Sequence, residues 1–255
     1  MDALLLSAGL GTRLRPHTDS WPKCLMPVAG RPLIDYWLLN LKLSGFKRVF
    51  INTHWKHKIV ENYLFGLEIG LDIVLMYEPE LLGTAGTLRS LNKFRDSEPI
   101  LLAHADNFCD IDVLKLKSFH NRHSAPITMV TFETNNPHEC GIVVHDAFNT
   151  VTEFYEKVSN PPSNQANAAI YIIDPLIIEY VNGDHSISDF SNQVLPNFLN
   201  NIKLFKHNGT LIDIGSFDRL KLAQTVKMDG FKNICNLAVK RPILSPEYQK
   251  IVSEL

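Results

Sequence analysis

Several common signatures are missing from this sequence, and each absence excludes a class of protein. The four cysteines show no CxxC spacing and no zinc-like pairing with histidines, so we expect reduced thiols instead of disulfides or a structural zinc site. No apolar run reaches the length of a membrane span, and the apolar run after Met1 is short and not preceded by basic residues. We therefore expect a cytoplasmic protein without a signal peptide or membrane segment.

Long basic runs are absent too. The formal net charge is −2 and at most two basic residues are adjacent, which argues against nucleic acid or an anionic membrane as a partner. The GxGxxG pattern of dinucleotide-binding oxidoreductases and the Walker GxxxxGK[ST] pattern are both missing. With 255 residues, 45% of them hydrophobic and 20% charged, the chain has an ordinary globular composition. Any anion site must therefore be local.

The first half of the chain alternates short apolar runs with segments of helical periodicity, which predicts a βαβαβαβ order and a doubly wound parallel sheet. Strands are expected at 3–6, 48–52, 72–77 and 99–103, and helices at 32–44, 57–65 and 84–94. The second half has closely spaced strands at 127–133, 141–145, 151–155 and 169–173. These predict mixed or antiparallel additions to the same sheet, without a linker between independent domains.

The stretch SAGLGTRLRP directly follows the first expected strand. Ligands bind at the carboxyl ends of strands in open α/β sheets, and glycines there let backbone amides approach a phosphate. Gly9 and Gly11 fit that description, while Arg13 and Arg15 supply positive charge. Further on, Lys23 lies between prolines in WPKCLMPVAGRPLI, and the prolines stiffen the chain around it.

Together these motifs resemble those of the sugar-1-phosphate nucleotidyltransferases, in which G-x-G-T-R-[LM]-x-P-x-T is followed by P-K and P-V-x-x-x-P. The resemblance extends to about Gln224. It implies a Rossmann-like doubly wound mixed sheet, the nucleotide-diphospho-sugar transferase fold, with a nucleotidyltransferase domain at 1–227 and a C-terminal tail packed on it at 228–255. It also implies condensation of a nucleoside triphosphate with a sugar 1-phosphate, which releases pyrophosphate. Arg13 would neutralise the pyrophosphate and Lys23 would bind phosphate during the reaction.

Transfer of this kind needs cations, amide donors and a metal instead of a nucleophilic side chain. Two carboxylates stand where Mg²⁺ ligands are expected: Asp106 follows the buried strand in LLAHADN, and Asp213 follows a short strand in GTLIDIGS. Mg²⁺ takes one or two carboxylates plus substrate oxygens, so this pair is sufficient. Both aspartates also match metal positions of the resembled family, and Mg²⁺ is the cofactor implied.

The resemblance assigns the remaining site residues by their match to family motifs. A second glycine loop, LLGTAGTLRS, would lie near the base, and Glu78 just before it is a candidate acceptor for a guanine edge. The nucleotide-binding candidates are Leu6, Ala8, Gly9, Gly11, Thr12, Glu78, Gly83, Thr84 and Gly86. The candidates for binding the sugar phosphate are Asn107, Gly141, Glu156, Lys157 and Asn167. One departure is Ala169, which stands where the family motif N-A-G-I-Y has glycine.

Short mannose-1-phosphate or heptose-1-phosphate guanylyltransferases resemble the chain most, so GTP is the favoured triphosphate. A cytidylyltransferase that acts on a sugar or a phosphorylated amine or amide stays open, because the shared loops bind phosphates and not bases. A non-catalytic regulatory subunit of the same fold is disfavoured, because Arg13, Lys23, Asp106 and Asp213 are all present. The sequence leaves open the sugar and whether the chain forms a homo-oligomer.

Overall fold

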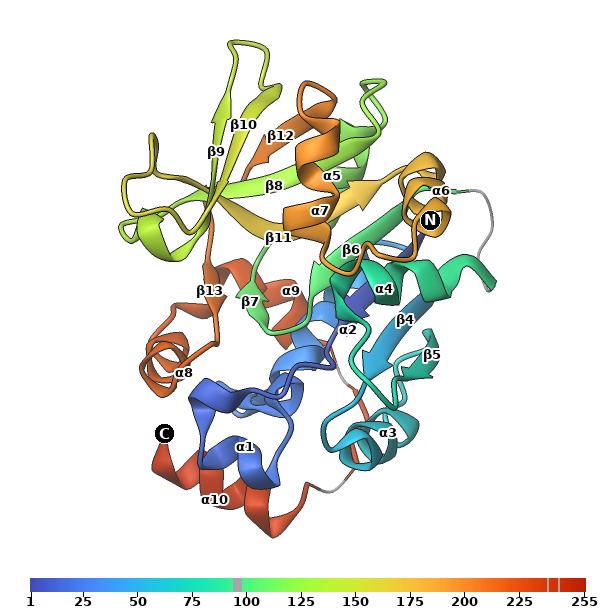
Figure 1. Cartoon of the computed structure of the whole chain (residues 1–255). Coiled ribbons are helices and arrows are strands. Elements are labelled where there is room, and N and C mark those ends of the chain that lie inside the picture. Colours follow the sequence, from blue (N-terminus) through green and yellow to red (C-terminus); the bar gives the residue numbers. More distant parts are fainter. Residues whose placement is uncertain (94–97, 238, 243) are drawn as a thin grey trace. The chain divides into compact units, whose positions relative to one another are not determined.

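The structure, a computed structural model, describes residues 1–93, 98–237, 239–242 and 244–255. The chain forms two units (Figure 1). Unit 1 comprises Met1–Asp2, Leu82–Ala103 and Asp112–Asn208, and unit 2 comprises Ala3–Leu81, His104–Ile111 and Gly209–Leu255. The chain passes between the units several times, so each unit is assembled from segments that are distant in sequence.

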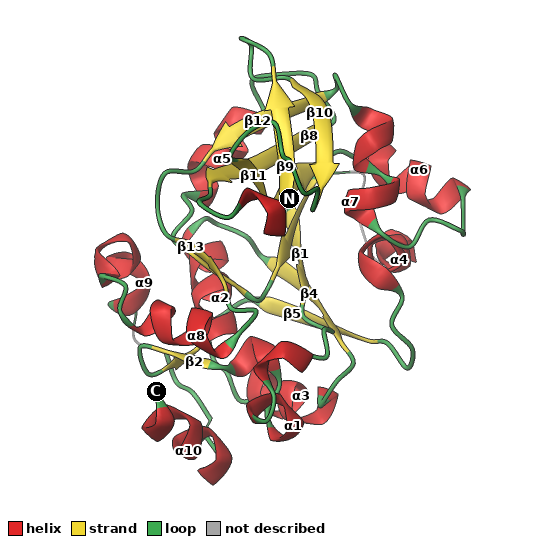
Figure 2. Ribbon diagram, turned by 60° about the vertical axis from the view of Figure 1, so that its left-hand side comes forward, coloured by secondary structure: helices red, strands yellow, loops and turns green. Residues whose placement is uncertain are grey.

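Unit 2 contains three parallel strands in the order β1 (Asp2–Leu6), β4 (Arg48–Thr53) and β5 (Asp72–Tyr77), which lie side by side in Figure 2. Ala3, Leu4 and Leu5 are fully buried, as expected of a continuous apolar strand. Helix α2 (Leu33–Leu43) precedes β4 and helix α3 (His57–Phe65) precedes β5. Helix α2 ends just before Gly45, which adopts φ +76°, a conformation that favours glycine at helix ends.

The other elements of unit 2 are short. They are η1 (Thr12–Leu14), α1 (His17–Ser20), η2 (Lys23–Leu25), the pair β2 (Pro27–Val28) and β3 (Arg31–Pro32), the antiparallel pair β7 (Asn107–Cys109) and β13 (Leu211–Asp213), α8 (Phe217–Gln224), η6 (Met228–Phe231), α9 (Lys232–Cys235) and α10 (Pro246–Glu254).

Cys235 and Arg241, which lie after residue 227, make polar contacts with the rest of unit 2. Asp35 on α2 is 1% exposed, and its carboxylate accepts hydrogen bonds from Arg241 Nε and from Tyr63 Oη, the latter at 2.6 Å. Burial raises the pKa of Asp35, although both hydrogen bonds oppose the shift. Arg31 Nη2 also donates to the Cys235 carbonyl at 2.7 Å. The boundary at residue 227 stays a prediction.

Unit 1 holds strands in the order β10 (Val151–Glu156), β9 (Gly141–His145), β11 (Gln165–Ile173) and β6 (Ile100–His104), and the three pairs that these four strands form are antiparallel. Strand β8 (Ile127–Glu133) pairs with β11 and with β12 (Ile202–Lys206). Strands β9 and β10 form the hairpin at the top of Figure 1. The helices of this unit are α4 (Gly83–Ser90), η3 (Leu91–Lys93), α5 (Val113–His120), η4 (Pro137–Glu139), α6 (Pro175–Gly183), α7 (Phe190–Gln193) and η5 (Leu195–Phe198).

The expected mixed α/β architecture is confirmed, with parallel strands from the first half and mainly antiparallel strands from the second. Two elements differ from the expectation by more than one residue at a boundary. The helix expected at 84–94 is α4 followed by a 3-10 turn, and its last expected residue, Phe94, lies outside the described residues. The strand expected at 169–173 begins at Gln165. No helix in the described part of the chain is long and apolar enough to cross a membrane.

Candidate functional site

The opening loop leaves β1 and turns at Gly11, where only glycine fits. Gly11 has φ +63°, and a Cβ there would lie 2.8 Å from Thr18 Cγ2. The Thr18 hydroxyl donates to the Gly11 carbonyl at 2.8 Å, which fixes the turn from the side of α1. Gly9 and Thr12 are exposed, and no atom lies within 4 Å of a Cβ built at Gly9. The loop thus presents open backbone to solvent.

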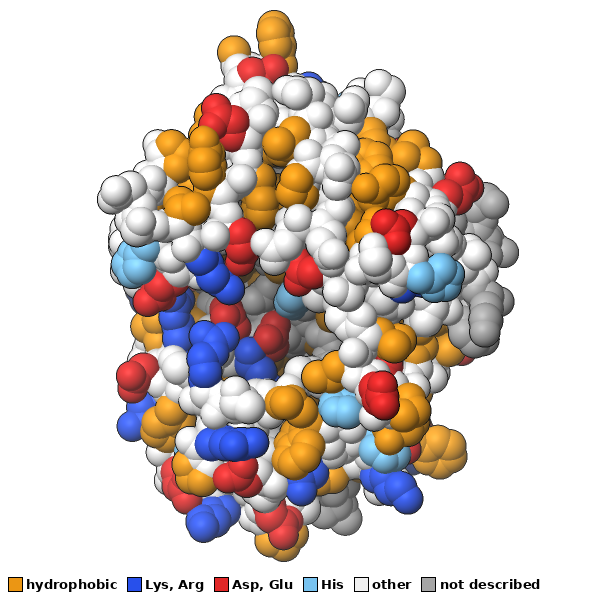
Figure 3. All heavy atoms as spheres, in the orientation of Figure 1, with side chains coloured by type: hydrophobic (Ala, Val, Ile, Leu, Met, Phe, Trp, Pro, Cys, Tyr) orange, Lys and Arg blue, Asp and Glu red, His pale blue; other side chains and the backbone are white. Residues whose placement is uncertain are grey.

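Lys23 lies between the two aspartates expected to bind metal. Its Nζ donates to Asp106 Oδ2 and, at 3.3 Å, to Asp213 Oδ1. The Lys23 side chain is 10% exposed, against 29% for Asp106 and 49% for Asp213. Arg13 Nη2 lies 3.8 Å from Asp213 Oδ2. The structure therefore brings together Arg13, Lys23, Asp106 and Asp213. Figure 3 shows acidic and basic side chains next to one another near β7 and β13.

The protonation of Asp106 follows from this setting. Burial alone would raise its pKa, but the charges of Lys23 and His104 and the hydrogen bond from Lys23 lower it below the ordinary value. Asp106 is therefore an ionised carboxylate at neutral pH. A low-dielectric setting strengthens its attraction for any cation.

Gly215 makes room for Arg13. A Cβ on Gly215 would lie 2.7 Å from Arg13 Nη2 and 3.0 Å from Asp213 Oδ2. Arg15, in contrast, pairs with Asp19 at 3.1 Å on the surface. Of the two loop arginines, only Arg13 is thus directed at the aspartate pair.

A network of hydrogen bonds joins the carboxyl ends of β1, β4 and β5. The Asn52 side chain accepts from Ser7 N at 2.6 Å and donates to Glu78 Oε1 at 3.0 Å. Glu78 is 3% exposed, and its carbonyl contacts His54 Nδ1 at 2.8 Å. Sequence reasoning selected Glu78 but missed Ser7 and Asn52. The sequence did contain a signal for Asn52, because INTHW places polar residues at the end of an otherwise apolar strand.

The neighbouring candidates at this edge have structural contacts of their own. The Leu6 carbonyl accepts from Ala105 N at 2.9 Å, which places the Asp106 segment beside the end of β1. Ala8 is 6% exposed. Asn107 is 5% exposed, and its carbonyl accepts from Trp37 Nε1 at 2.8 Å. These contacts position the loop and the metal candidates.

The second glycine loop belongs to unit 1. Gly83 has φ +75°, and a Cβ there would clash with the Ser188 backbone, while Gly86 lies inside α4 with its nearest neighbour at Leu82. The Thr84 hydroxyl accepts from Phe190 N at 2.7 Å. These residues therefore hold the start of α4 against the segment before α7, and that packing by itself explains the glycine at position 83.

The sugar-side candidates in unit 1 include a cluster on the β9–β10 hairpin. Gly141 faces Glu156 in the strand register, and a Cβ on Gly141 would lie 2.6 Å from Glu156 Oε2. Lys157 Nζ lies 3.4 Å from Glu156 Oε1. Glycine at 141 thus creates the space that the Glu156 carboxylate occupies, beside a cation.

Asn167 and Ala169 form an irregularity in β11. Ala169 has φ +53°, which is a left-handed conformation, and the pairing with β8 shifts between Asn167 and Tyr171. The Asn167 side chain accepts from Ala169 N at 3.0 Å and donates to Tyr171 Oη at 2.6 Å. This backbone geometry is the physical reason why glycine suits position 169 and why alanine is strained there.

Among the described residues, no cluster of three or more His, Cys, Asp or Glu side chains is arranged to hold a metal ion. The aspartate pair at Lys23 is the arrangement that fits Mg²⁺, because Asp106 and Asp213 already converge on one cation. Mg²⁺ commonly completes such a set with water and phosphate oxygens.

A family model for nucleotidyl transferases matches residues 2–227. The mannose-1-phosphate guanyltransferase of Pichia angusta is 30% identical over 223 residues, which are 84% of this chain and 61% of that protein. The mannose-1-phosphate guanylyltransferase of Mycobacterium tuberculosis is 30% identical over 200 residues, 78% of this chain and 55% of that protein. The chain thus spans about three fifths of the length of the first of these relatives.

Among solved structures, HddC from Yersinia pseudotuberculosis has a TM-score of 0.74 and 23% identity, covering 88% of this chain and 97% of that chain. The same protein has also been solved in complex with GMP-PN, with a TM-score of 0.73. At this identity the likeness shows the fold.

Proposed function

Because the chain belongs to the nucleotidyl transferase family, as its opening motif indicated, we propose that it condenses a nucleoside triphosphate with a sugar 1-phosphate. An oxygen of the sugar phosphate attacks the α-phosphorus, and the bond from that phosphorus to the bridging α–β oxygen breaks. Pyrophosphate leaves with the bonding electron pair, and a nucleotide sugar is formed. The observation that carries the proposal is the convergence of Lys23 and Arg13 on Asp106 and Asp213.

In this proposal, the residues of unit 2 act by charge and position. Arg13 is 73% exposed, so its guanidinium is free to meet the leaving pyrophosphate, where negative charge develops. Lys23 is held at the carboxylates and offers its ammonium to a phosphate oxygen of the reacting substrates. The exposed backbone at Gly9 and Thr12 gives amide donors to the triphosphate. Such fixed donors need little reorganisation during the reaction.

Asp106 and Asp213 would hold Mg²⁺. When bound, the ion would neutralise part of the negative charge of the phosphates. The ionised state of Asp106 supports this assignment. Lys23 Nζ donates to oxygens of both carboxylates, and the same carboxylates would serve as ligands of the ion.

We propose GTP as the triphosphate, because the relatives are guanylyltransferases and the fold neighbour was solved with GMP-PN. A guanine edge offers N1–H and N2–H donors, so the protein must provide acceptors. Glu78 is nearly buried and accepts from Asn52, which leaves main-chain carbonyls of the second glycine loop, with Gly83, Thr84 and Gly86, as further candidates. CTP is the competing triphosphate.

For the acceptor we propose mannose 1-phosphate or a closely related sugar 1-phosphate. Glu156 would bind sugar hydroxyls and Lys157 the sugar's phosphate. Gly141 supports this by leaving room for the Glu156 carboxylate. We also propose that Asn107 and Asn167 bind the sugar phosphate. The domain at 1–227 with its tail, the cytoplasmic location and any homo-oligomer stay predictions.

The decisive experiment measures pyrophosphate release with GTP, CTP, ATP, UTP and dTTP, each against a panel of sugar 1-phosphates and phosphorylated amines. We expect GTP with mannose 1-phosphate to be fastest, and ATP to be at least tenfold slower, because a buried acceptor left unpaired costs about 1 to 3 kcal/mol. A clear preference for CTP would support the cytidylyltransferase alternative. No release with any pair would instead favour the non-catalytic subunit.

A further inference from the structure

Arg89, which was not among the candidates from the sequence, ties the helix of the second glycine loop to two other segments of unit 1. Its Nε donates to the Val181 carbonyl at 3.1 Å. Its Nη2 donates to the carbonyls of Asp184 at 2.8 Å and Ile187 at 2.6 Å. Val181 lies in the last turn of α6, where carbonyls lack partners within the helix. The other two acceptors lie between α6 and α7, and Figures 1 and 2 show α4, α6 and α7 next to one another.

Residues 184–189, here called the strap, also contact the start of α4. The Ser188 carbonyl accepts from Ala85 N at 2.9 Å. Directly after the strap, Phe190 N donates to the Thr84 hydroxyl at 2.7 Å. Helix α4 is eight residues long. It is therefore fastened at both ends, at its start by these two hydrogen bonds and near its end by the Arg89 guanidinium.

The strap is braced by polar side chains of its own and of α7. Asp184 Oδ1 accepts from Ser186 N at 2.8 Å and from the Ser186 hydroxyl at 2.7 Å. Gln193 Oε1 accepts from Ser188 N and from the next backbone amide, both at 2.8 Å. These bonds hold the carbonyls of the strap in place. Arg89 thus holds α4 against a segment whose geometry is itself fixed.

We propose that Arg89 is a positioning residue for the nucleobase, because through the strap it fixes the start of α4 and the main-chain groups of the second glycine loop. This inference rests on the proposed function, in which Gly83, Thr84 and Gly86 bind the nucleotide. Arg89 is half-buried and spends its hydrogen bonds on carbonyls of the protein, so it acts without touching the ligand. Contacts to a base are the same before and during transfer of the nucleotidyl group, so their loss should raise KM and leave kcat.

The test measures pyrophosphate release by the full chain, with kcat and KM determined for each nucleoside triphosphate. Arg89→Gln removes the guanidinium fork. Because a displacement of about 1 Å can cost on the order of a hundredfold, we expect the KM of the preferred triphosphate to rise by about tenfold to a hundredfold. The preference over the next-best triphosphate should narrow by at least about threefold, while the KM for the sugar 1-phosphate should stay within about twofold of the parent's.

A second variant loosens the strap from the other side. Gln193→Ala leaves α4 intact and removes the acceptor of the Ser188 amide, so it tests the proposal even if Arg89→Gln does not fold. It should raise the KM of the same triphosphate in the same direction, by about twofold to tenfold.

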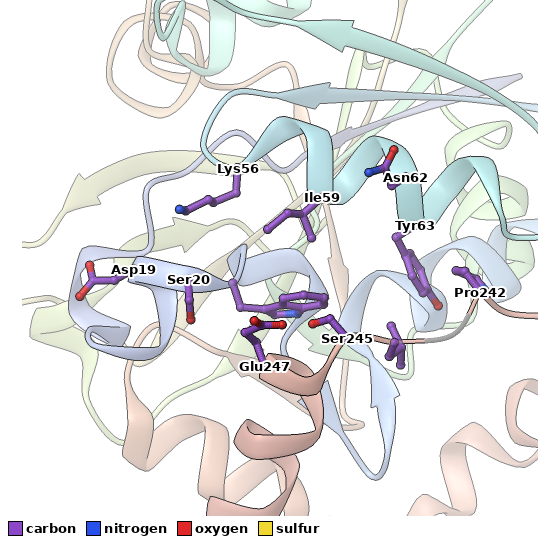
Figure 4. Close-up of a pocket in the computed structure, with 11 residues that line it drawn as sticks. Asp19, Ser20, Lys56, Ile59, Asn62, Tyr63, Pro242, Ser245 and Glu247 are labelled. Atoms are coloured by element: carbon purple, nitrogen blue, oxygen red, sulfur yellow. The ribbon is translucent and has the colours of Figure 1, made fainter.

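Two controls in unit 2 test for a general loss of stability. Arg31→Gln removes another arginine that donates to a carbonyl, that of Cys235 at 2.7 Å. Ser245→Ala removes the side chain that caps α10, which Figure 4 shows among the lining residues of a pocket. Both should lower the melting temperature and leave the KM and the base preference of the parent.

The possible outcomes separate the roles. Partial unfolding lowers kcat equally with every triphosphate and leaves KM unchanged, and this pattern in Arg89→Gln and Gln193→Ala would overturn the proposal. An equal rise of KM in Arg31→Gln would overturn it too. A parent that turns over, together with folded variants that keep its KM and base preference, would overturn this inference alone. A parent that releases pyrophosphate with no pair of substrates would overturn the proposed function and this inference with it.

Discussion

Gly215→Ala is a minimal way to move Arg13 without removing its charge. A Cβ at position 215 would lie 2.7 Å from Arg13 Nη2 and 3.0 Å from the Arg13 Cζ. An ordinary carbon–nitrogen contact is about 3.5 Å or longer, so the guanidinium has to retreat by about 1 Å. The Arg13 side chain is 73% exposed, and Gly215 has no positive φ. The retreat therefore costs little stability.

The catalytic cost should be larger. A misplacement of about 1 Å in a group that meets the transition state is worth on the order of a hundredfold in rate. We expect Gly215→Ala to lower kcat for pyrophosphate release by about tenfold to a hundredfold, with a small change in the KM for the sugar phosphate. Gly183→Ala is the control, because a Cβ at Gly183 meets nothing within 4 Å and its φ is also not positive. Thermal unfolding of both variants checks that the fold is kept.

A double-mutant cycle distinguishes displacement of Arg13 from any other effect. If Gly215→Ala acts only through Arg13, the double variant with Arg13→Ala should be no slower than Arg13→Ala alone. Multiplicative losses would show that the methyl group disturbs something else, such as Asp213. An unchanged kcat in Gly215→Ala would refute the assignment of Arg13 to the leaving pyrophosphate.

Three further outcomes follow from the structure. Asp213→Asn should abolish turnover at saturating Mg²⁺ while circular dichroism and the melting temperature stay close to the parent's, and retained activity would remove Asp213 from the metal site. Ala169→Gly should raise the free energy of unfolding by about 0.5 to 1 kcal/mol, because relief of the left-handed strain of about 1 to 2 kcal/mol exceeds the entropy cost of glycine; urea unfolding that shows a loss would contradict this reading of β11. Burial, with the neighbouring His120 and Lys203, lowers the pKa of His123 in the fold, so the unfolded chain binds its proton more tightly. Stability should therefore fall as the pH drops below about 6.5, and His123→Gln should reduce that slope in urea titrations at pH 7.5 to 5.

The sequence alone predicted most strands of the large sheet and selected Arg13, Lys23, Asp106 and Asp213 as candidate site residues. An apolar run without polar interruptions, as at 3–6, is stable only when both faces are covered. The buried parallel strand could therefore be predicted from the local sequence. The aspartates were found because each stands at a strand end: Asp106 comes just after β6, and Asp213 is the last residue of β13. The cations were found because they sit in a glycine- and proline-rich loop. These are properties of short segments, which is why one-dimensional patterns were sufficient.

The sequence could not supply the partners of these segments. The hydrogen bonds from Lys23 to Asp106 and Asp213 join residues 83 and 190 positions apart, and the Ser7–Asn52–Glu78 network joins three strand ends. Strand β12, absent from our expectations, is defined by its parallel pairing with β8. Such contacts depend on which strands become neighbours, and no local pattern encodes that choice.

Ala169 and Gly83 show, at single positions, what the sequence indicates and what only the tertiary structure reveals. The family motif marked position 169 as unusual, but only the backbone reveals the positive φ that makes alanine strained and glycine suitable. Gly83 is a nucleotide-binding candidate from its motif, and the structure adds that the Ser188 backbone lies against it; its role at the base stays a prediction. A glycine in a sequence indicates that space or a special dihedral angle is needed. Only the tertiary structure identifies the atoms that occupy that space, because at Gly83 they come from a segment about a hundred residues away.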